Sequence, residues 1–350
     1  MAKTFDYSFL WEGSIPAQVV QLAQGVQALK SMSSVRSGQF AGLYAELEKI
    51  ARVQSVKSSN AMEGIVTTDE RIRAIVTQEC APLNHAEEEI AGYRDALGLI
   101  HRNHATVQVN QQTTLHLHAV MQRLSAGPAA GRYKQDDNVI VELDTAGNRR
   151  IRFTPSSAAD TPRDMEQMFL AFQEAAGHVG ENMLLLIPCL VLDFLCIHPF
   201  ADGNGRVSRL LSLLLLYRSG HDVGRYISLE EQINNRKGAY YRALADSSRG
   251  WHNNAHDYFP FMAEFLTALF LCYKELDKRF AITRTGKVNK TQRIETAVLD
   301  SLIPISKREL CSLLPDISPT TVEAVLGKMV RDGKIQRIGQ ARASRYARMP

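Results

Sequence analysis

The sequence contains few cysteines and no pair of the CxxC type. Its five cysteines are Cys80, Cys189, Cys196, Cys272 and Cys311, and most of them lie in apolar segments with helical periodicity. A disulfide framework and a cysteine-based zinc site are therefore excluded as the basis of the fold. The pattern indicates buried thiols in a reducing compartment.

Long apolar segments and a secretory leader are lacking as well. The N-terminal stretch MAKTFDYSFLWEG has no apolar core of the kind that directs secretion. The longest apolar run, 183–192, contains Pro188 and stops at Asp193, so it is too short for a bilayer and fits a buried core helix. We therefore expect a cytoplasmic protein with no membrane partner.

Most of the chain has no excess of positive or negative charge, although the net charge of the whole sequence is +4. Residues 287–350 contain 12 of the 41 Lys and Arg and 6 of the 37 Asp and Glu, which leaves 29 against 31 elsewhere. The basic character therefore belongs to the C-terminal end. A length of 350 residues makes two domains a reasonable expectation, and the charge difference favours a separate C-terminal one.

Alternation of the strand type is almost absent, and apolar residues recur with the 3.6-residue period of helices. We predict a mainly α protein without internal repeats. Helices are predicted at 16–31, 39–53, 68–78, 85–102, 113–124, 163–177, 182–197, 206–218, 229–247 and 257–278.

One segment departs from the helical pattern. Residues 138–143 and 149–153 read as strands, and they flank the turn-like residues 144–148. This arrangement predicts a β-hairpin. A lone hairpin is only marginally stable unless it packs on something, so we expect it to have a role beyond that of a loop ornament.

The C-terminal residues have a compact pattern of their own. After a polar stretch at 282–290, which we interpret as a linker, helices are predicted at 292–301, 307–314 and 319–331, followed by two short strands within 334–348. Ser306 and Ser318 are suitable N-caps, Pro319 suits a first helical position, and Gly333 suits a helix end. This order is typical of a winged helix-turn-helix.

Two kinds of partner stay open for this C-terminal module. The wing offers basic side chains for the phosphates of DNA, namely Arg337, Arg342, Arg345 and Arg348. Winged helices also serve as protein-interaction or dimerisation modules, and Glu323 on the third helix does not favour DNA. We expect a homodimer.

A polar loop with the sequence HPFADGNGRVSR occupies 198–209, between two apolar helical segments. Gly203 and Gly205 permit positive φ angles and close approach of a ligand to the backbone. The following helix begins with free N–H groups, which form an anion site. Arg206 and Arg209 are three residues apart on that helix, and two guanidinium groups there suit a polyphosphate.

The same loop carries an acid and a base. Asp202 lies where a carboxylate holds a Mg²⁺ ion that bridges phosphates. His198 lies at the other lip, where an imidazole accepts a proton from a hydroxyl nucleophile at neutral pH. The loop follows a helix and lacks a Gly-Lys-Ser/Thr sequence, so it is not a Walker loop. The simpler interpretation is a polar loop with surface salt bridges, but the whole set in one loop favours phosphate chemistry.

The loop is similar to the Fic-domain motif HxFx(D/E)GNGRxxR at every fixed position. The likeness extends over roughly residues 50–280, with a helical core, a hairpin "flap" before the motif and the pair Tyr240-Tyr241 after it. The resemblance implies AMPylation, in which AMP passes from ATP to a Ser, Thr or Tyr hydroxyl of a target protein or of the enzyme itself. It also implies ATP and Mg²⁺ as cofactors.

The resemblance implies a role for each position of the motif. His198 would be the general base, Phe200 a core anchor and Asp202 the Mg²⁺ ligand. The turn Gly203-Asn204-Gly205 would hold the α-phosphate, while Arg206 and Arg209 would hold the β- and γ-phosphates. Further roles fall to Val139, Ile140 and Val141, which would align the target segment by strand addition, and to Tyr240 and Tyr241, which would line the adenine pocket.

A second motif lies near the N-terminus, at SSNAMEGI. Ser59 and Glu63 are four residues apart and share a helix face, and Gly64 follows. Beside a Fic motif, this resembles the inhibitory motif (S/T)xxxE(G/N) of self-inhibited family members. The resemblance implies that Glu63 pairs with Arg209, which then cannot hold the γ-phosphate.

These interpretations give a domain plan and three functional hypotheses. The plan is an N-terminal helical region at 1–105 with an inhibitory helix at about 55–64, a Fic catalytic core at 106–280, a linker at 281–290 and a winged helix-turn-helix at 291–350. The leading hypothesis is a self-inhibited protein adenylyltransferase. The alternatives are a DNA-binding regulator whose Fic core senses nucleotides, and an enzyme that uses Glu63 to remove AMP.

Overall fold

The mainly helical fold predicted from the sequence is present in the computed structural model, which describes residues 3–37, 41–125, 129–143, 149–284, 290–299, 301, 304–314, 317–339 and 344–349. The helices before the polar loop are α1 (Phe9–Glu12), α2 (Ala17–Ser37), α3 (Ala41–Met62), α4 (Asp69–Val76), α5 (His85–Asn103), α6 (Gln111–Gln122), α7 (Thr161–Val179) and α8 (Met183–Ile197). Those after it are α9 (Asn204–Arg218), α10 (Leu229–Asn235), α11 (Lys237–Ser248), α12 (Phe259–Arg284), α13 (Lys290–Leu299), α14 (Lys307–Leu313) and α15 (Pro319–Arg331).

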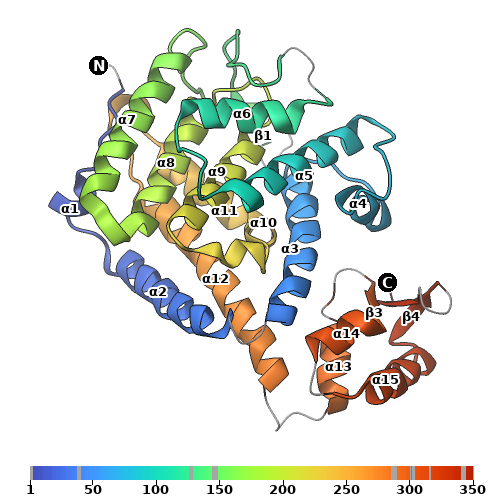
Figure 1. Cartoon of the computed structure of the whole chain (residues 1–350). Helices are drawn as coiled ribbons and strands as arrows, with labels where there is room; N and C mark the ends of the chain where they lie inside the picture. Colours follow the sequence, from blue (N-terminus) through green and yellow to red (C-terminus); the bar gives the residue numbers. More distant parts are fainter. Residues whose placement is uncertain are drawn as a thin grey trace.

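The centre of the protein is formed by α8 and α9, which the polar loop joins. Both helices are buried along most of their length. For α8 this is expected, because it is apolar on nearly all sides, whereas α9 also buries Arg206 and Arg209 in its first turns. Figure 1 shows them enclosed by the surrounding helices, among them α5, α7 and α12. Because close-packed interiors resist deformation, the two ends of the loop are held rigidly. No helix in the described ranges is long and apolar enough to cross a membrane.

A buried carboxylate in α8 ties distant segments to this centre. Asp193 accepts hydrogen bonds from the Tyr7 hydroxyl (2.8 Å), the Tyr258 hydroxyl (2.8 Å) and Trp251 Nε1 (2.6 Å). A buried charge is tolerated when such donors surround it. The N-terminal segment and the residues just before α12 are thereby fixed to α8, the helix that His198 follows.

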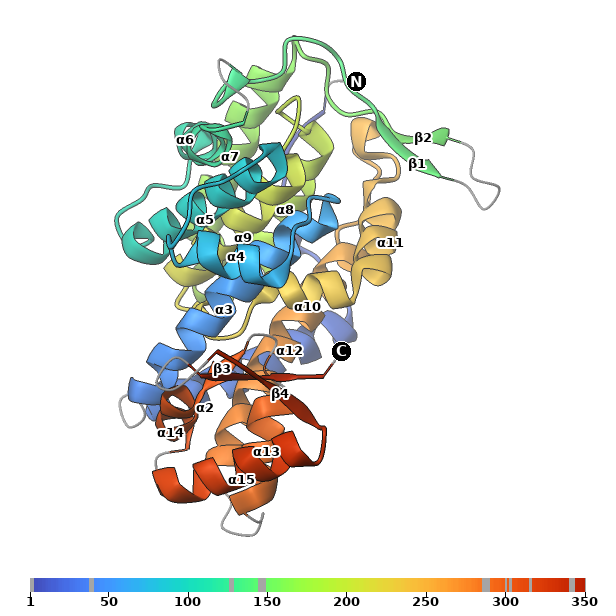
Figure 2. The same ribbon diagram turned by 90° about the vertical axis from the view of Figure 1, so that its right-hand side faces the viewer.

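The predicted hairpin is present as strands β1 (Ile140–Leu143) and β2 (Arg149–Phe153). They pair antiparallel, with Val141 opposite Ile151, and a bulge lies between Ile140 and Val141. The predicted turn, 144–148, lies outside the described residues. Figure 2 shows that the hairpin extends from the body of the protein beside α11.

The C-terminal residues form a small unit with its own apolar core. Three helices, α13 to α15, accompany a sheet of strands β3 (Ile305–Ser306), β4 (Ile335–Ile338) and β5 (Arg345–Arg348), in the order β3-β5-β4. Ser306 and Ser318 cap α14 and α15 as predicted. The strand β3 was not predicted, because two residues are too few for a periodic signal. Figure 2 shows the unit below α3, which α14 contacts.

Several predicted boundaries are wrong. The helices predicted at 16–31 and 39–53 in fact end at Ser37 and Met62. The linker 281–290 is too long, because α12 continues to Arg284 and α13 begins at Lys290. A helix whose earlier turns are packed, here up to the buried Phe280, continues easily beyond its last buried residue. Residues 285–289 of the linker lie outside the described residues. Residues 38–40 do so too, and they include the predicted start of the helix at 39–53.

The helix predicted at 229–247 is in fact two helices, α10 and α11. The chain bends at Arg236, whose Nε and Nη2 donate to the two carboxylate oxygens of Glu264 at 2.7 Å. The segment predicted as a separate inhibitory helix, 55–64, is the last part of the long helix α3. That helix ends at Met62, and Gly64 follows with a φ of +79°.

Candidate active site

The shape of the polar loop is fixed by one amide side chain. Asn204 Oδ1 accepts a hydrogen bond from the Phe200 backbone N–H (2.9 Å), and its Nδ2 donates to the Phe200 carbonyl (2.7 Å). Gly203 has a φ of +80°, which favours glycine, and it leads into the first turn of α9. The Asn204 side chain therefore shapes the loop, and only the backbone there is left for a ligand.

His198 follows α8 directly, in the left-handed region with a φ of +52°. Its Nδ1 lies 3.3 Å from the Leu195 carbonyl, and because a carbonyl only accepts, Nδ1 carries the proton and Nε2 keeps a free lone pair. Burial lowers the pKa of His198 to about 4. The imidazole is therefore neutral at pH 7, as a general base must be.

Arg209 is held by the end of α3. Its Nε donates to Ser59 Oγ (2.8 Å), and its Nη2 donates to the Ser59 carbonyl (2.9 Å) and to Glu63 Oε1 (2.8 Å). The side chain is 3% exposed. Although burial opposes its charge, the carboxylate of Glu63 raises the pKa of Arg209. The two residues of the N-terminal motif thus bind the same guanidinium group.

Glu63 also lies against the first turn of α9. A Cβ atom at Gly205 would overlap Glu63 Oε1, so only glycine allows this approach. The amino end of a helix attracts anions through its free N–H groups and its dipole. The carboxylate of Glu63 therefore occupies the kind of position that a phosphate would take, between a helix start and an arginine.

These groups face one cavity of about 440 Å³. The predicted site residues that line it are Glu63, Ile140, Val141, His198, Gly205, Arg209, Tyr240 and Tyr241, and they come from four separate parts of the chain. The centroids of the two tyrosine rings are 5.9 Å apart, and the ring planes meet at 78°. Of the remaining predicted residues, Val139 lies just before β1 and is 48% exposed. Ser59 lies one helical turn before Glu63, and Gly64 directly follows it.

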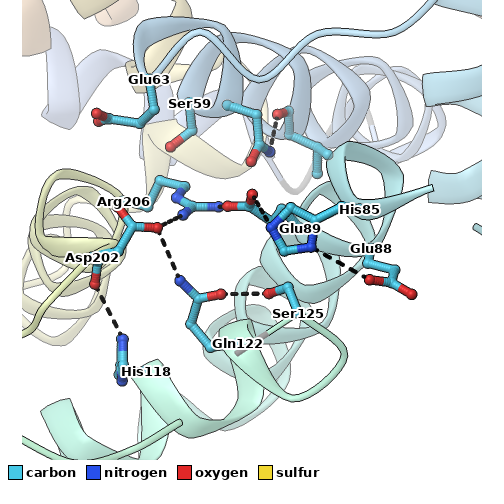
Figure 3. Close-up of polar contacts among 12 residues, drawn as sticks. Ser59, Glu63, His85, Glu88, Glu89, His118, Gln122, Ser125, Asp202 and Arg206 are labelled. Atoms are coloured by element: carbon cyan, nitrogen blue, oxygen red, sulfur yellow. Dashed lines mark hydrogen bonds and ion pairs between the residues drawn. The ribbon is translucent and has the colours of Figure 1, made fainter. Parts of the chain in front are cut away.

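Arg206 does not reach this cavity, contrary to the expectation that both arginines serve the phosphates together. Its guanidinium is 1% exposed and lies between Glu89 Oε2 (Nη1, 2.5 Å) and Asp202 Oδ2 (Nη2, 3.1 Å). Figure 3 shows it between these two carboxylates. Although residues three apart are neighbours on a helix, Glu89 of α5 binds Arg206 and Glu63 of α3 binds Arg209, so the two guanidinium groups are held by different helices.

Asp202 is the candidate ligand for Mg²⁺. Its side chain is 77% exposed. Its Oδ2 accepts hydrogen bonds from Arg206 Nη2 and from Gln122 Nε2 (3.4 Å), whereas no described residue donates to its Oδ1. No group of three His, Cys, Asp or Glu in the described part of the chain is placed to hold a metal ion. A single carboxylate fits Mg²⁺, which usually takes one or two protein ligands together with substrate phosphates and water.

Two residues that connect the hairpin and α6 with the loop were not predicted. Lys134 donates from Nζ to the Ile197 carbonyl (3.2 Å) and to Asn138 Oδ1 (2.8 Å), and burial lowers its pKa to about 8. His118 stacks on Phe200 at 3.9 Å and donates from Nε2 to the Asp202 carbonyl (3.2 Å). Neither belongs to a motif, so the sequence alone gave no signal for them.

Parts of this chain match known proteins. The profile of the Fic/DOC family matches residues 108–216. A Fido domain-containing protein of Dictyostelium discoideum is 30% identical over 116 residues, which cover 32% of this chain and 79% of that protein. The chain belongs to the Fic/DOC family.

Two further matches extend beyond the Fic domain. The protein adenylyltransferase Fic of Nematostella vectensis is 30% identical over 184 residues, or 49% of this chain, but this chain spans only 39% of that protein. The solved structure of a Fic family protein from Desulfovibrio desulfuricans G20 has a TM-score of 0.63 at 21% identity and covers 96% of this chain and 97% of that chain. At this identity the likeness is one of fold.

Proposed function

We propose that this Fic protein is a protein adenylyltransferase that transfers AMP from ATP to a protein hydroxyl and is restrained by Glu63. One observation carries the proposal. The neutral base His198 and the arginine Arg209 face the same cavity, and in that cavity Glu63 binds Arg209 and lies against Gly205. The similarity to an adenylyltransferase of Nematostella vectensis supports the choice of reaction.

In the proposed reaction, His198 Nε2 takes the proton from a Ser, Thr or Tyr hydroxyl of the target. The hydroxyl oxygen forms a bond to the α-phosphorus of ATP, the bond from that phosphorus to the β-phosphate oxygen breaks, and pyrophosphate leaves. The backbone of Gly205 and the start of α9 stabilise the charge on the α-phosphate. Such a transfer needs mainly positioning and charge stabilisation.

The substrates have distinct places in this proposal. Tyr240 and Tyr241 line the side of the cavity that would take adenine. When bound, Mg²⁺ held by Asp202 would neutralise charge on the phosphates. The outer edge of β1, which pairs only with β2 among the described strands, would accept the target segment as an added strand.

The restraint follows from competition for one guanidinium group. Arg209 already has Ser59 and Glu63 as partners, so a γ-phosphate has to displace the Glu63 carboxylate before Arg209 can hold it. ATP bound without that contact would place its α-phosphate unfavourably for attack. The brake thus acts on the pose of ATP and leaves His198 unaltered.

Parallel incubations with ATP labelled at the α- or the γ-phosphate test the proposed reaction. Adenylyl transfer is expected to leave the α-label on protein and to release the γ-label in pyrophosphate. Both incubations should use the protein with Glu63→Gly, so that restraint does not mask transfer. Retention of the γ-label on protein would show a phosphotransferase instead and refute the proposal.

Removal of AMP is a second candidate, and one observation favours it. The Glu63 side chain is 31% exposed and lines the same cavity as His198, so it is placed to orient a water molecule there. Purified AMP-modified protein distinguishes the two activities. Release of AMP by the unaltered chain, lost with Glu63→Gly, would favour removal.

We further propose that the C-terminal unit is a winged helix-turn-helix that binds DNA phosphates. Arg337 and Arg348 are exposed on its strands, whereas Arg342 lies outside the described residues. The full chain is expected to bind duplex DNA at low salt, with affinity that falls steeply as salt rises. Arg337→Ala with Arg348→Ala should lower the slope of log affinity against log salt by about two.

The control for the DNA measurement is Arg249→Ala. The Arg249 side chain is 81% exposed, and the residue lies outside the C-terminal unit. This substitution should leave the slope unchanged. Absence of DNA binding at low salt would favour the protein-interaction role, and the expected homodimer would then be its first candidate partner.

A further inference from the structure

A second cavity, of about 620 Å³, lies between α3, α5, the segment that follows α4 and the end of α6. Figure 1 shows α3 and α5 in contact along this part of the body. The cavity shares no lining residue with the cavity around His198. The helical spacing of Arg94, Gly98 and Arg102 places them on the side of α5 opposite to Glu89, which holds Arg206.

The lining of this cavity is strongly basic. Four arginines line it, namely Arg52, Arg94, Arg102 and Arg123, and the single acid is Asp95. Asp95 already binds Arg94 (2.8 Å) and Arg123 (3.3 Å). One carboxylate therefore serves two of the four guanidinium groups, and three positive charges are in excess.

The other two arginines, Arg52 and Arg102, have no partner among the described residues. Neither Arg52 nor Arg102 has a hydrogen bond or ion pair with any residue of the described ranges, and Arg52 Nε is buried without an acceptor. Their guanidinium groups converge, because a methyl group at Gly98 would lie 3.0 Å from Arg102 Nη1 and 3.7 Å from Arg52 Nη2. A buried donor without an acceptor costs free energy, which a bound acceptor would recover.

Electrostatics agree with this geometry. Burial and the charges of Arg94 and Arg102 lower the pKa of Arg52, and Asp95 and Glu48 offset this only in part. Like charges that converge without a counter-ion repel one another. An anion between them would remove the repulsion and satisfy the free N–H groups.

We propose that this cavity binds a small ligand with at least two phosphate charges. Guanidinium forks bind phosphate oxygens in pairs, and Arg52 and Arg102 present two such forks from different helices. The volume suits a small molecule. Leu99 and Val120 add an apolar wall, on which an organic part of the ligand would rest.

Inorganic pyrophosphate is a suitable probe, and the chain contains a local reporter for it. Cys80 lines the cavity and is partly exposed. Cys311 is also partly exposed, but it belongs to the C-terminal unit and serves as the internal control. We expect pyrophosphate at low salt to slow alkylation of Cys80 several-fold, measured by mass spectrometry, and to leave Cys311 unaffected. A bound anion both covers the thiol and disfavours its reactive thiolate.

Variants assign the effect to this cavity. Arg52→Gln and Arg102→Ala should each raise the pyrophosphate concentration for half-protection about tenfold, because each removes a charged hydrogen-bond donor. Arg249→Ala should leave it unchanged, and so should Arg209→Ala, which alters the cavity around His198. Thermal unfolding confirms that each variant is folded. Absence of protection in the unaltered chain, its persistence in both cavity variants, or its loss with Arg209→Ala would overturn the proposal.

Discussion

Replacing Glu63 by glycine is expected to raise self-labelling from α-labelled ATP about 10- to 100-fold. The substitution frees Arg209 from a hydrogen bond between two charged groups, which contributes about 1.5–3 kcal/mol, and each 1.4 kcal/mol corresponds to a factor of ten. Gly205 and the start of α9 become accessible to phosphate at the same time. The measurement is the initial rate of label incorporation at saturating ATP.

Two further variants separate charge from shape in this experiment. Glu63→Gln keeps the size of the side chain and removes its charge, so it should give a large part of the increase. Glu79→Gly replaces another exposed glutamate in a turn just beyond a helix and should change nothing. Equal labelling by Glu63→Gly and the unaltered chain would show that the contact between Glu63 and Arg209 does not restrain transfer.

Replacing His198 by alanine in the Glu63→Gly protein is expected to lower labelling at least 100-fold. Positioned general bases typically contribute factors of about 10² to 10⁴, and the free lone pair on Nε2 is the only basic group that His198 presents. The pKa of His198 is about 4, so His198 stays neutral between pH 6 and 8. Labelling by the Glu63→Gly protein with His198 intact should therefore not depend on His198 protonation in that range. The measurement is again the rate of incorporation, now followed across that pH range.

The backbone at this position requires a second variant. His198 has a φ of +52°, where alanine is disfavoured and asparagine is tolerated. His198→Asn should therefore abolish labelling as alanine does, with smaller loss of stability. Labelling that persists in a folded His198→Asn protein would exclude His198 as the base.

Much of the candidate site was predictable because its chemistry is local. The loop 198–209 carries its base, its glycines and its arginines within twelve residues, and the pairing of a helix start with these residue types indicates phosphate binding. The caps at Ser306 and Ser318 were equally local, and both are present. The pair formed by Glu63 and Arg209 was expected only through the resemblance to self-inhibited Fic proteins.

Other features depended on packing between distant segments. The helix breaks at Arg236, whose side chain pairs with Glu264 on another helix, and the helical period of 229–247 could not reveal either feature. Lys134 and His118 support the loop from outside any motif. Hydrophobic periodicity indicates the buried face of a helix, but it does not indicate which residues of another helix pack against that face.

The sequence by itself determined the helical class, the family resemblance and the chemical groups of the loop, since these depend on residue types at short spacings. Only the tertiary structure decided which arginine faces the cavity. Arg206 is held by Glu89 of α5, whereas Arg209 meets Ser59 and Glu63 of α3. Only packing also brought Arg52 and Arg102 together over Gly98, because their distance depends on how α3 and α5 pack.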